Sequence, residues 1–146
     1  MKFSRTTSNE IETQSLAAEL CQRFGTHAFY ALKGDLGTGK TCFVQGLAAA
    51  LGINAAVCSP TFTIANEYVG ENYLRLIHLD LYRLTGPQEL ESIGWDDYLD
   101  SGDAMAVEWP ERAKDELPAR TILVAFKMGA SPDERIITVI PPERNR

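Results

Sequence analysis

The spacing of apolar residues over the first fifty positions changes from a helical period to a strand and back again. Behind a T-x-x-E sequence at 7–10, which is typical of a helix-capping box, apolar residues recur every three or four positions until Gly25. Residues 28–33 are apolar and aromatic and lead into a glycine-rich turn, which favours a buried strand. Residues 40–51 return to helical spacing, with Gly52 as the expected C-cap.

Strand patterns dominate the later part of the chain. Strands are expected at 62–68, 73–81, 104–108, 121–126 and 136–140. Turn residues between the first two and between the last two favour two hairpins. Short helical pieces are expected at 88–93 and 95–99, after Pro87. The sequence therefore predicts an α/β fold with a mainly parallel central sheet and additional antiparallel strands.

Composition narrows the class of protein. With 146 residues, 45% of them hydrophobic and 23% charged, the chain is expected to be one globular domain over 1–146. A net charge of −6, with Lys and Arg scattered singly, disfavours stand-alone nucleic-acid binding. Three widely separated cysteines suit reduced thiols, and neither a leader nor an apolar run of about 20 residues is present. We therefore expect a soluble cytoplasmic protein without membrane contact.

The most informative motif is GDLGTGKT at 34–41, which satisfies the P-loop pattern G-x-x-x-x-G-K-[ST]. Its place between an expected strand and an expected helix disfavours a chance glycine-rich turn. Backbone N–H groups of such a loop cradle phosphates, while Lys40 reaches the β- and γ-phosphates and the Thr41 hydroxyl binds Mg²⁺. The expected nucleotide contacts are Gly37, Thr38, Gly39, Lys40, Thr41 and Cys42. The fold class is accordingly that of a P-loop NTPase.

Two apolar runs end in an acid, LIHLD at Asp80 and AMAVE at Glu108. Either carboxylate could hold Mg²⁺ or polarise the attacking water, although a single strand-end carboxylate is more often a solvated cap. His78 shares a strand face with Asp80 and suits a packed or hydrogen-bonded histidine. Thr61 is a candidate switch residue that senses the γ-phosphate, with an ordinary turn hydroxyl as the alternative. Trp109 suits either stacking on a base or partner, or the core.

The sequence lacks a motif that would indicate which nucleotide base is bound. No N-K-x-D or T-K-x-D occurs, so the usual guanine-reading element is missing and adenine is favoured. We place the base near the first helix or near the loop around Asp133. Four arginines are candidate phosphate contacts, with solvated surface positions as the default: Arg83, Arg112, Arg120 and Arg135.

Beyond the P-loop, four further segments occur in a characteristic order. They are SPTF at 59–62, HLDLYRL at 78–84, ELESIGWDDYL at 89–99 and EWPE at 108–111. Together with the P-loop they resemble the TsaE family of bacterial ATPases, which are required for making N6-threonylcarbamoyladenosine in tRNA. The resemblance covers nearly the whole chain.

The resemblance implies a small Mg²⁺-dependent ATPase that hydrolyses ATP slowly when alone. It implies work with the proteins TsaB and TsaD, of which TsaD transfers the threonylcarbamoyl group, so that tRNA is contacted only through the complex. It also implies Lys40 as the phosphate lysine, Thr41 and Glu108 as metal-site residues, and Asp80 near the metal and the attacking water. Thr61 resembles a switch threonine, and Trp109 a residue near the nucleotide or the partner surface.

Two positions depart from the pattern of the family. Cys42 stands where a second hydroxyl residue is common, which leaves the backbone N–H contact to phosphate intact. Gln45 stands where a basic residue is frequent, which puts any charge-dependent contact there in doubt.

Two other functions fit the same P-loop. A small-molecule kinase would need an acceptor site and usually an arginine-bearing lid, for which little chain remains. A nucleotide-gated binding module would use ATP to order the segments of Thr61 and Asp80 and so form a partner surface.

Overall fold

Seven strands form one sheet in the computed structural model, which describes residues 2–60, 64–70 and 72–142. The strands are β1 (Phe3–Thr7), β2 (Phe29–Lys33), β3 (Ala65–Val69), β4 (Arg75–Asp80), β5 (Ala104–Glu108), β6 (Thr121–Met128) and β7 (Arg135–Ile140). Their order across the sheet is β1-β7-β6-β2-β5-β4-β3. The four neighbours β6, β2, β5 and β4 are parallel, whereas β1, β7 and β3 pair antiparallel. The predicted parallel centre with added antiparallel strands is confirmed.

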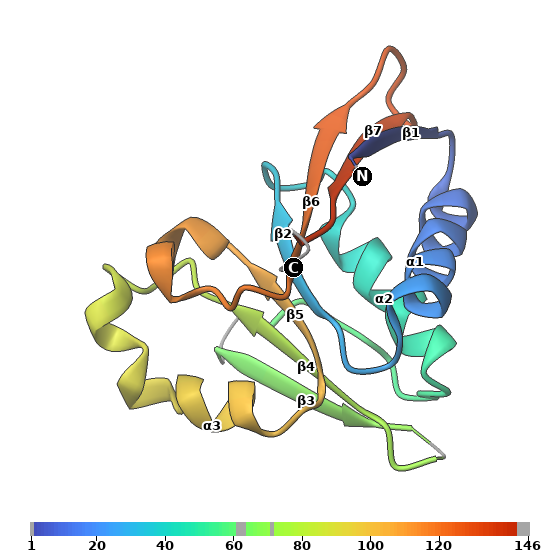
Figure 1. The fold of residues 1–146 in the computed structure, drawn as a ribbon. Coiled ribbons are helices and arrows are strands. Elements are labelled where there is room, and N and C mark those ends of the chain that lie inside the picture. Colours follow the sequence, from blue (N-terminus) through green and yellow to red (C-terminus); the bar gives the residue numbers. More distant parts are fainter. Residues whose placement is uncertain (1, 61–63, 71, 143–146) are drawn as a thin grey trace.

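Each face of the sheet is covered by its own set of helices (Figure 1). Three α-helices occur in the described part of the chain: α1 (Glu10–Phe24), α2 (Lys40–Ala50) and α3 (Trp95–Asp100). Helices α1 and α2 pack together on one face, and the other face carries α3 with short 3-10 helices. The 3-10 helices span Pro87–Glu89, Glu91–Ile93, Pro110–Arg112 and Lys114–Glu116.

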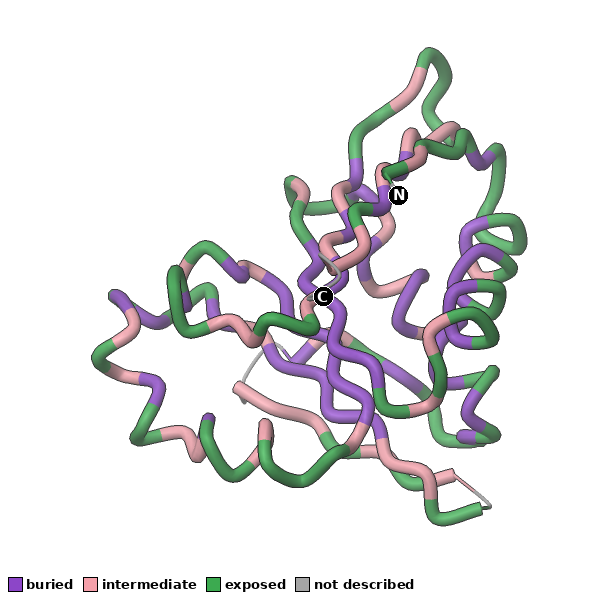
Figure 2. The backbone as a smooth tube through the Cα atoms, viewed as in Figure 1, coloured by how far each residue is buried: buried purple, intermediate pink, exposed green. Residues whose placement is uncertain are grey.

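Alternation along the central strands divides the core into two apolar clusters. On β4, Leu76 packs on the side of α1 and α2, and Ile77 on the side of α3. Tyr30 and Phe29 of β2 separate in the same way. The buried residues accordingly lie mostly on the central strands of the sheet and on the sides of the helices that face it (Figure 2). Because both faces are covered, the central strands are apolar almost throughout, as parallel strands usually are.

The start of the first helix differs from the sequence-based prediction. The expected capping box at 7–10 is wrong, because Thr7 is the last residue of β1 and pairs with Arg135 of β7. Asn9 caps α1 instead, and its side-chain oxygen accepts the N–H of Glu12 at 2.8 Å. Strand β1 was not predicted, since its burial pattern shows only one buried residue among five and carries no alternating apolar signal.

The remaining elements follow the predictions closely. Strand β5 has the expected bounds, both hairpins form, and the helical pieces after Pro87 are present. Helix α2 ends one residue earlier than expected, before Leu51, and Gly52 has a positive φ of 75°. All three cysteines are free thiols, as expected. No helix among the described residues has the length and apolar character needed to cross a bilayer.

Candidate functional site

A glycine-rich loop joins the end of β2 to the start of α2. Gly39, at the N-cap of α2, has a φ of +100°, a left-handed conformation that strains any residue with a side chain. Gly34 packs so closely that an added Cβ would lie 2.9 Å from the carbonyl oxygen of Phe126. The first turn of α2 thus presents its N–H groups and the positive end of its dipole at the loop. This arrangement can bind a phosphate group.

Lys40 is almost fully buried although it begins α2, with 5% of its surface exposed. Its Nζ donates a hydrogen bond of 2.6 Å to the carbonyl oxygen of Gly34. The same ammonium lies 3.8 Å from Oε1 of Glu108 and 5.1 Å from the ring centre of Trp109. The lysine therefore bridges the glycine-rich loop and the end of β5.

Two carboxylates lie side by side at the carboxyl ends of β4 and β5, where Asp80 is paired in register with Glu108. Parallel strands bring such ends together at one edge of the sheet. Oδ1 of Asp80 accepts the N–H of Tyr82 at 2.9 Å. Burial raises the pKa of Asp80, and the nearby charge of Glu108 adds to the rise, while the Tyr82 hydrogen bond and Lys40 oppose it.

Glu108 is 4% exposed, so its carboxylate needs partners inside the protein. Lys40 faces Oε1, and Nε2 of His78 lies 2.6 Å from Oε2. His78 is fully buried on β4, in agreement with the predicted packed or hydrogen-bonded histidine. The two oxygens of Glu108 are thus held from different sides.

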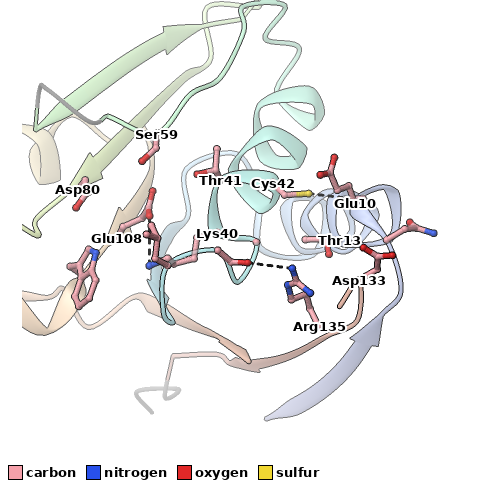
Figure 3. Close-up of a pocket in the computed structure, with 15 residues that line it drawn as sticks. Glu10, Thr13, Lys40, Thr41, Cys42, Ser59, Asp80, Glu108, Asp133 and Arg135 are labelled. Carbon is pink, nitrogen blue, oxygen red and sulfur yellow. Dashed lines mark hydrogen bonds and ion pairs between the residues drawn. The ribbon is translucent and has the colours of Figure 1, made fainter. Parts of the chain in front are cut away.

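These groups line a cavity of about 640 Å³ that is open to solvent (Figure 3). Lys40 and Thr41 lie at its middle, and Asp80, Ser59 and Glu108 lie toward one end. The other end is formed by Glu10 and Thr13 of α1 and by Asp133 and Arg135 at and just before the start of β7. Asn9, the N-cap of α1, also lines the cavity. The cavity therefore extends from the acidic strand ends across the glycine-rich loop to the first helix.

Arg135 connects the far end of the cavity to the loop. One guanidinium nitrogen, Nη2, donates to the carbonyl oxygen of Gly37 at 3.3 Å, and Nη1 donates to the carbonyl oxygens of Pro132 and Glu134. Of the four candidate arginines, Arg135 alone lines this cavity within the described residues. It fixes the loop against the β6–β7 turn.

The oxygen atoms near Lys40 have the character of ligands for a hard divalent cation. Thr41 offers a hydroxyl, and Asp80 and Glu108 offer carboxylates. Among the described residues, no group of three or more His, Cys, Asp or Glu side chains is arranged as a cation cage. The set suits Mg²⁺, which keeps several waters and takes further ligands from a phosphate substrate.

The structure gathers most of the residues that the sequence singled out. Gly37, Gly39, Lys40, Thr41, Cys42, Asp80, Glu108 and Trp109 all line the cavity. Thr38 does not: it is 3% exposed, and its hydroxyl donates to the carbonyl oxygen of Asp35 at 2.6 Å. Its side chain therefore stabilises the loop. Thr61 lies outside the described residues.

Sequence reasoning missed part of the lining. Asn9 and Glu10 lie in the expected capping box, Thr13 in the helical pattern behind it and Ser59 in the SPTF segment, and none of these patterns indicates that the residues line the cavity. The only signal pointing to α1 was the general placement of the base near the first helix. Nothing in the local sequence indicates that the start of α1 lies opposite the loop at 130–135, since that contact comes from the pairing of β1 with β7.

Comparison with known proteins places these motifs in a family. The model of the family described as "Threonylcarbamoyl adenosine biosynthesis protein TsaE" matches residues 7–137. The tRNA threonylcarbamoyladenosine biosynthesis protein TsaE of Bacillus subtilis is 39% identical over 90% of this chain and 81% of its own. The protein of the same name from Synechocystis is 44% identical over 74% of this chain and 69% of its own. The crystal structure of Bacillus subtilis YdiB has a TM-score of 0.77 with 33% identity, covering 98% of this chain and 87% of that chain.

Proposed function

The chain belongs to the TsaE family, and we propose that it is the ATPase subunit required for threonylcarbamoyladenosine modification of tRNA. Its proposed role is to bind ATP with Mg²⁺ and to hydrolyse it in support of the modification. The threonylcarbamoyl transfer itself is left to a partner. The names of the relatives support a role in making threonylcarbamoyladenosine. The geometry of the cavity supports binding and hydrolysis of ATP.

The observation that carries the proposal is the convergence on Lys40. This buried lysine lies between the glycine-rich loop and two strand-end carboxylates, in one open cavity. A P-loop NTPase needs three parts together: a loop whose backbone N–H groups bind the phosphates, a lysine that contacts them, and an acidic side chain near the metal. Asp80 and Glu108 supply the acid from two neighbouring strands.

In the proposed mechanism each group has a separate task. Lys40 leaves the carbonyl of Gly34 and binds the β- and γ-phosphates, whose charge exceeds that of its present neighbours. Thr41 and Glu108 would hold Mg²⁺, which when bound neutralises charge on the phosphates. Asp80, whose pKa is raised by burial, is suited to orient the attacking water. As water attacks the γ-phosphorus and its bond to the β-phosphate oxygen breaks, the loop N–H groups stabilise the negative charge that develops on the leaving ADP.

The partners in this proposal are the proteins TsaB and TsaD, with tRNA bound only through them. The net charge of −6 is consistent with that division, because an acidic surface does not collect a polyanion. Adenine is the proposed base, in the part of the cavity formed by α1 and by Asp133.

A direct test follows phosphate release with ATP and with GTP, in the presence and absence of purified TsaB and TsaD. We expect Mg²⁺-dependent hydrolysis of ATP in preference to GTP, faster with the partners than without. Absence of ATP hydrolysis under both conditions would overturn the ATPase proposal. Lys40→Ala is the matched inactive variant, and Lys127→Ala, on an exposed position of β6, is the control for loss of a lysine.

A small-molecule kinase is the second candidate because a further cavity of about 500 Å³ is lined in part by Asp80. It shares Leu36, Ser59, Asp80 and Trp109 with the first cavity, and its other lining residues are Pro60, Ile64, Tyr82 and Arg83. An acceptor bound there would lie beside the expected γ-phosphate. A phosphorylated metabolite formed in amounts equal to the ADP, with no free phosphate, would favour the kinase.

A further inference from the structure

His78 is a polar exception in an otherwise apolar strand. Its neighbours on β4, Leu76, Ile77 and Leu79, are fully buried, and so is His78 itself. A leucine would fill such a position at lower cost, because a buried imidazole must find hydrogen-bond partners. Packing alone therefore does not explain a histidine at this position.

Its one hydrogen bond in the described structure supplies that reason. Nε2 lies 2.6 Å from Oε2 of Glu108, and Nδ1 is buried without a partner among the described residues. A carboxylate oxygen can only accept, so Nε2 carries the hydrogen and donates it. The one hydrogen bond of the ring among the described residues is thus directed at one carboxylate oxygen.

The strand register fixes this contact. Asp80 is in register with Glu108, and His78 is two residues before Asp80 on β4, so all three side chains are on one face of the sheet. With Oε2 bound by His78, Oε1 is the oxygen that faces Lys40. When Lys40 turns to a phosphate, His78 is the described partner that still holds the carboxylate.

We propose that His78 is a positioning residue that holds Glu108 so that Oε1 faces Lys40 and the cavity, where the proposed Mg²⁺ would bind. The proposal rests on the proposed ATPase function for its effect on rate. Without the imidazole, the buried Oε2 has no donor, and the carboxylate is free to turn toward Lys40 or solvent. Partners behind a metal ligand commonly change affinity or activity by about 10- to 100-fold when removed.

The test compares His78→Leu, which keeps bulk and removes the donor, with His78→Gln, which keeps an N–H donor at similar reach. His27→Leu is the matched control, because the only other histidine bonds to the carbonyl of Gly102, away from the cavity. ATP turnover is measured together with the Mg²⁺ concentration that half-saturates binding of a fluorescent ADP analogue. The second measurement needs no hydrolysis.

We expect His78→Leu to lower kcat about tenfold or more without a matching rise in KM, and to raise the half-saturating Mg²⁺ similarly. His78→Gln should recover most of both losses. In a Glu108→Gln background, His78→Leu should have a much smaller effect, because its action passes through the carboxylate that Glu108→Gln removes. A merely structural role would lower thermal stability and would persist in that background.

The proposal is overturned if His78→Leu matches wild type in both measurements, or if His78→Leu costs as much with Glu108→Gln as without it. Failure of the proposed function looks different. A wild-type protein that releases no phosphate, with or without partners, overturns the ATPase proposal alone. The magnesium titration then still decides whether His78 orients Glu108.

Discussion

Replacing Glu108 by glutamine should slow hydrolysis and at the same time tighten binding of nucleotide without magnesium. Glu108 is 4% exposed, and its Oε1 lies 3.8 Å from Nζ of Lys40. Glutamine keeps the shape and can still accept from Nε2 of His78, but it removes the charge. Lys40 then keeps its hydrogen bond to the carbonyl of Gly34 and its contact with the ring of Trp109.

The size of the effect follows from the ion pair. Two unit charges 3.8 Å apart attract by about 4 kcal/mol at an effective dielectric constant of about 20. The net change is smaller, because a released lysine loses a partner and gains only partial hydration. One third of the attraction, about 1.4 kcal/mol, already corresponds to a tenfold change in Kd. Loss of a metal-site acid or general base should slow turnover by about 100-fold or more.

The assay titrates a fluorescent ADP analogue in EDTA and again in excess Mg²⁺. Glu111→Gln is the matched control, since it removes the same charge from an exposed position three residues away. We expect Glu108→Gln to bind about tenfold tighter than wild type in EDTA, and Glu111→Gln to bind as wild type does. Unchanged or weaker binding of Glu108→Gln in EDTA would refute the idea that the carboxylate restrains Lys40.

Three further substitutions test other parts of the account. Asn9→Ala removes the cap of α1 and should lower the free energy of unfolding by about 1 kcal/mol in urea denaturation. Gly34→Ala places a Cβ 2.9 Å from the carbonyl oxygen of Phe126, and should cost about 1–3 kcal/mol of stability and abolish nucleotide binding measured by fluorescence. Burial raises the pKa of Asp80 above the ordinary 3.8, so its ionisation destabilises the folded state as pH rises through the raised value. Asp80→Asn should therefore melt at a higher temperature than wild type at neutral pH, and the difference should vanish well below pH 3.8.

Local patterns were sufficient for the parts of the site that are contiguous in sequence. The P-loop motif at 34–41 predicted strand, turn and helix because its glycines and lysine act within one segment. Asp80 and Glu108 were identified because each ends an apolar run, and parallel strands bring such ends together. The motif did not indicate that Thr38 turns away, since its hydroxyl bonds back to the carbonyl of Asp35.

Contacts that depend on the edge of the sheet could not be predicted. Strand β1 has the sequence FSRTT, which contains no alternation of apolar and polar residues. In the structure only Thr7 among these residues is buried. Its pairing with β7 sets where α1 begins, and so brings Asn9 and Arg135 to one cavity. Sequence alone left Arg135 equal to three other arginines. Only the folded sheet distinguishes it, through its bond to Gly37.

The most direct test of the central claim is the threonylcarbamoyladenosine content of tRNA in cells whose own copy of the gene carries Lys40→Ala. Nucleoside analysis should show loss of the modification, because the buried lysine is the proposed phosphate ligand. Cells carrying Lys127→Ala should retain it. Wild-type levels of the modification with a stably expressed Lys40→Ala protein would contradict the account.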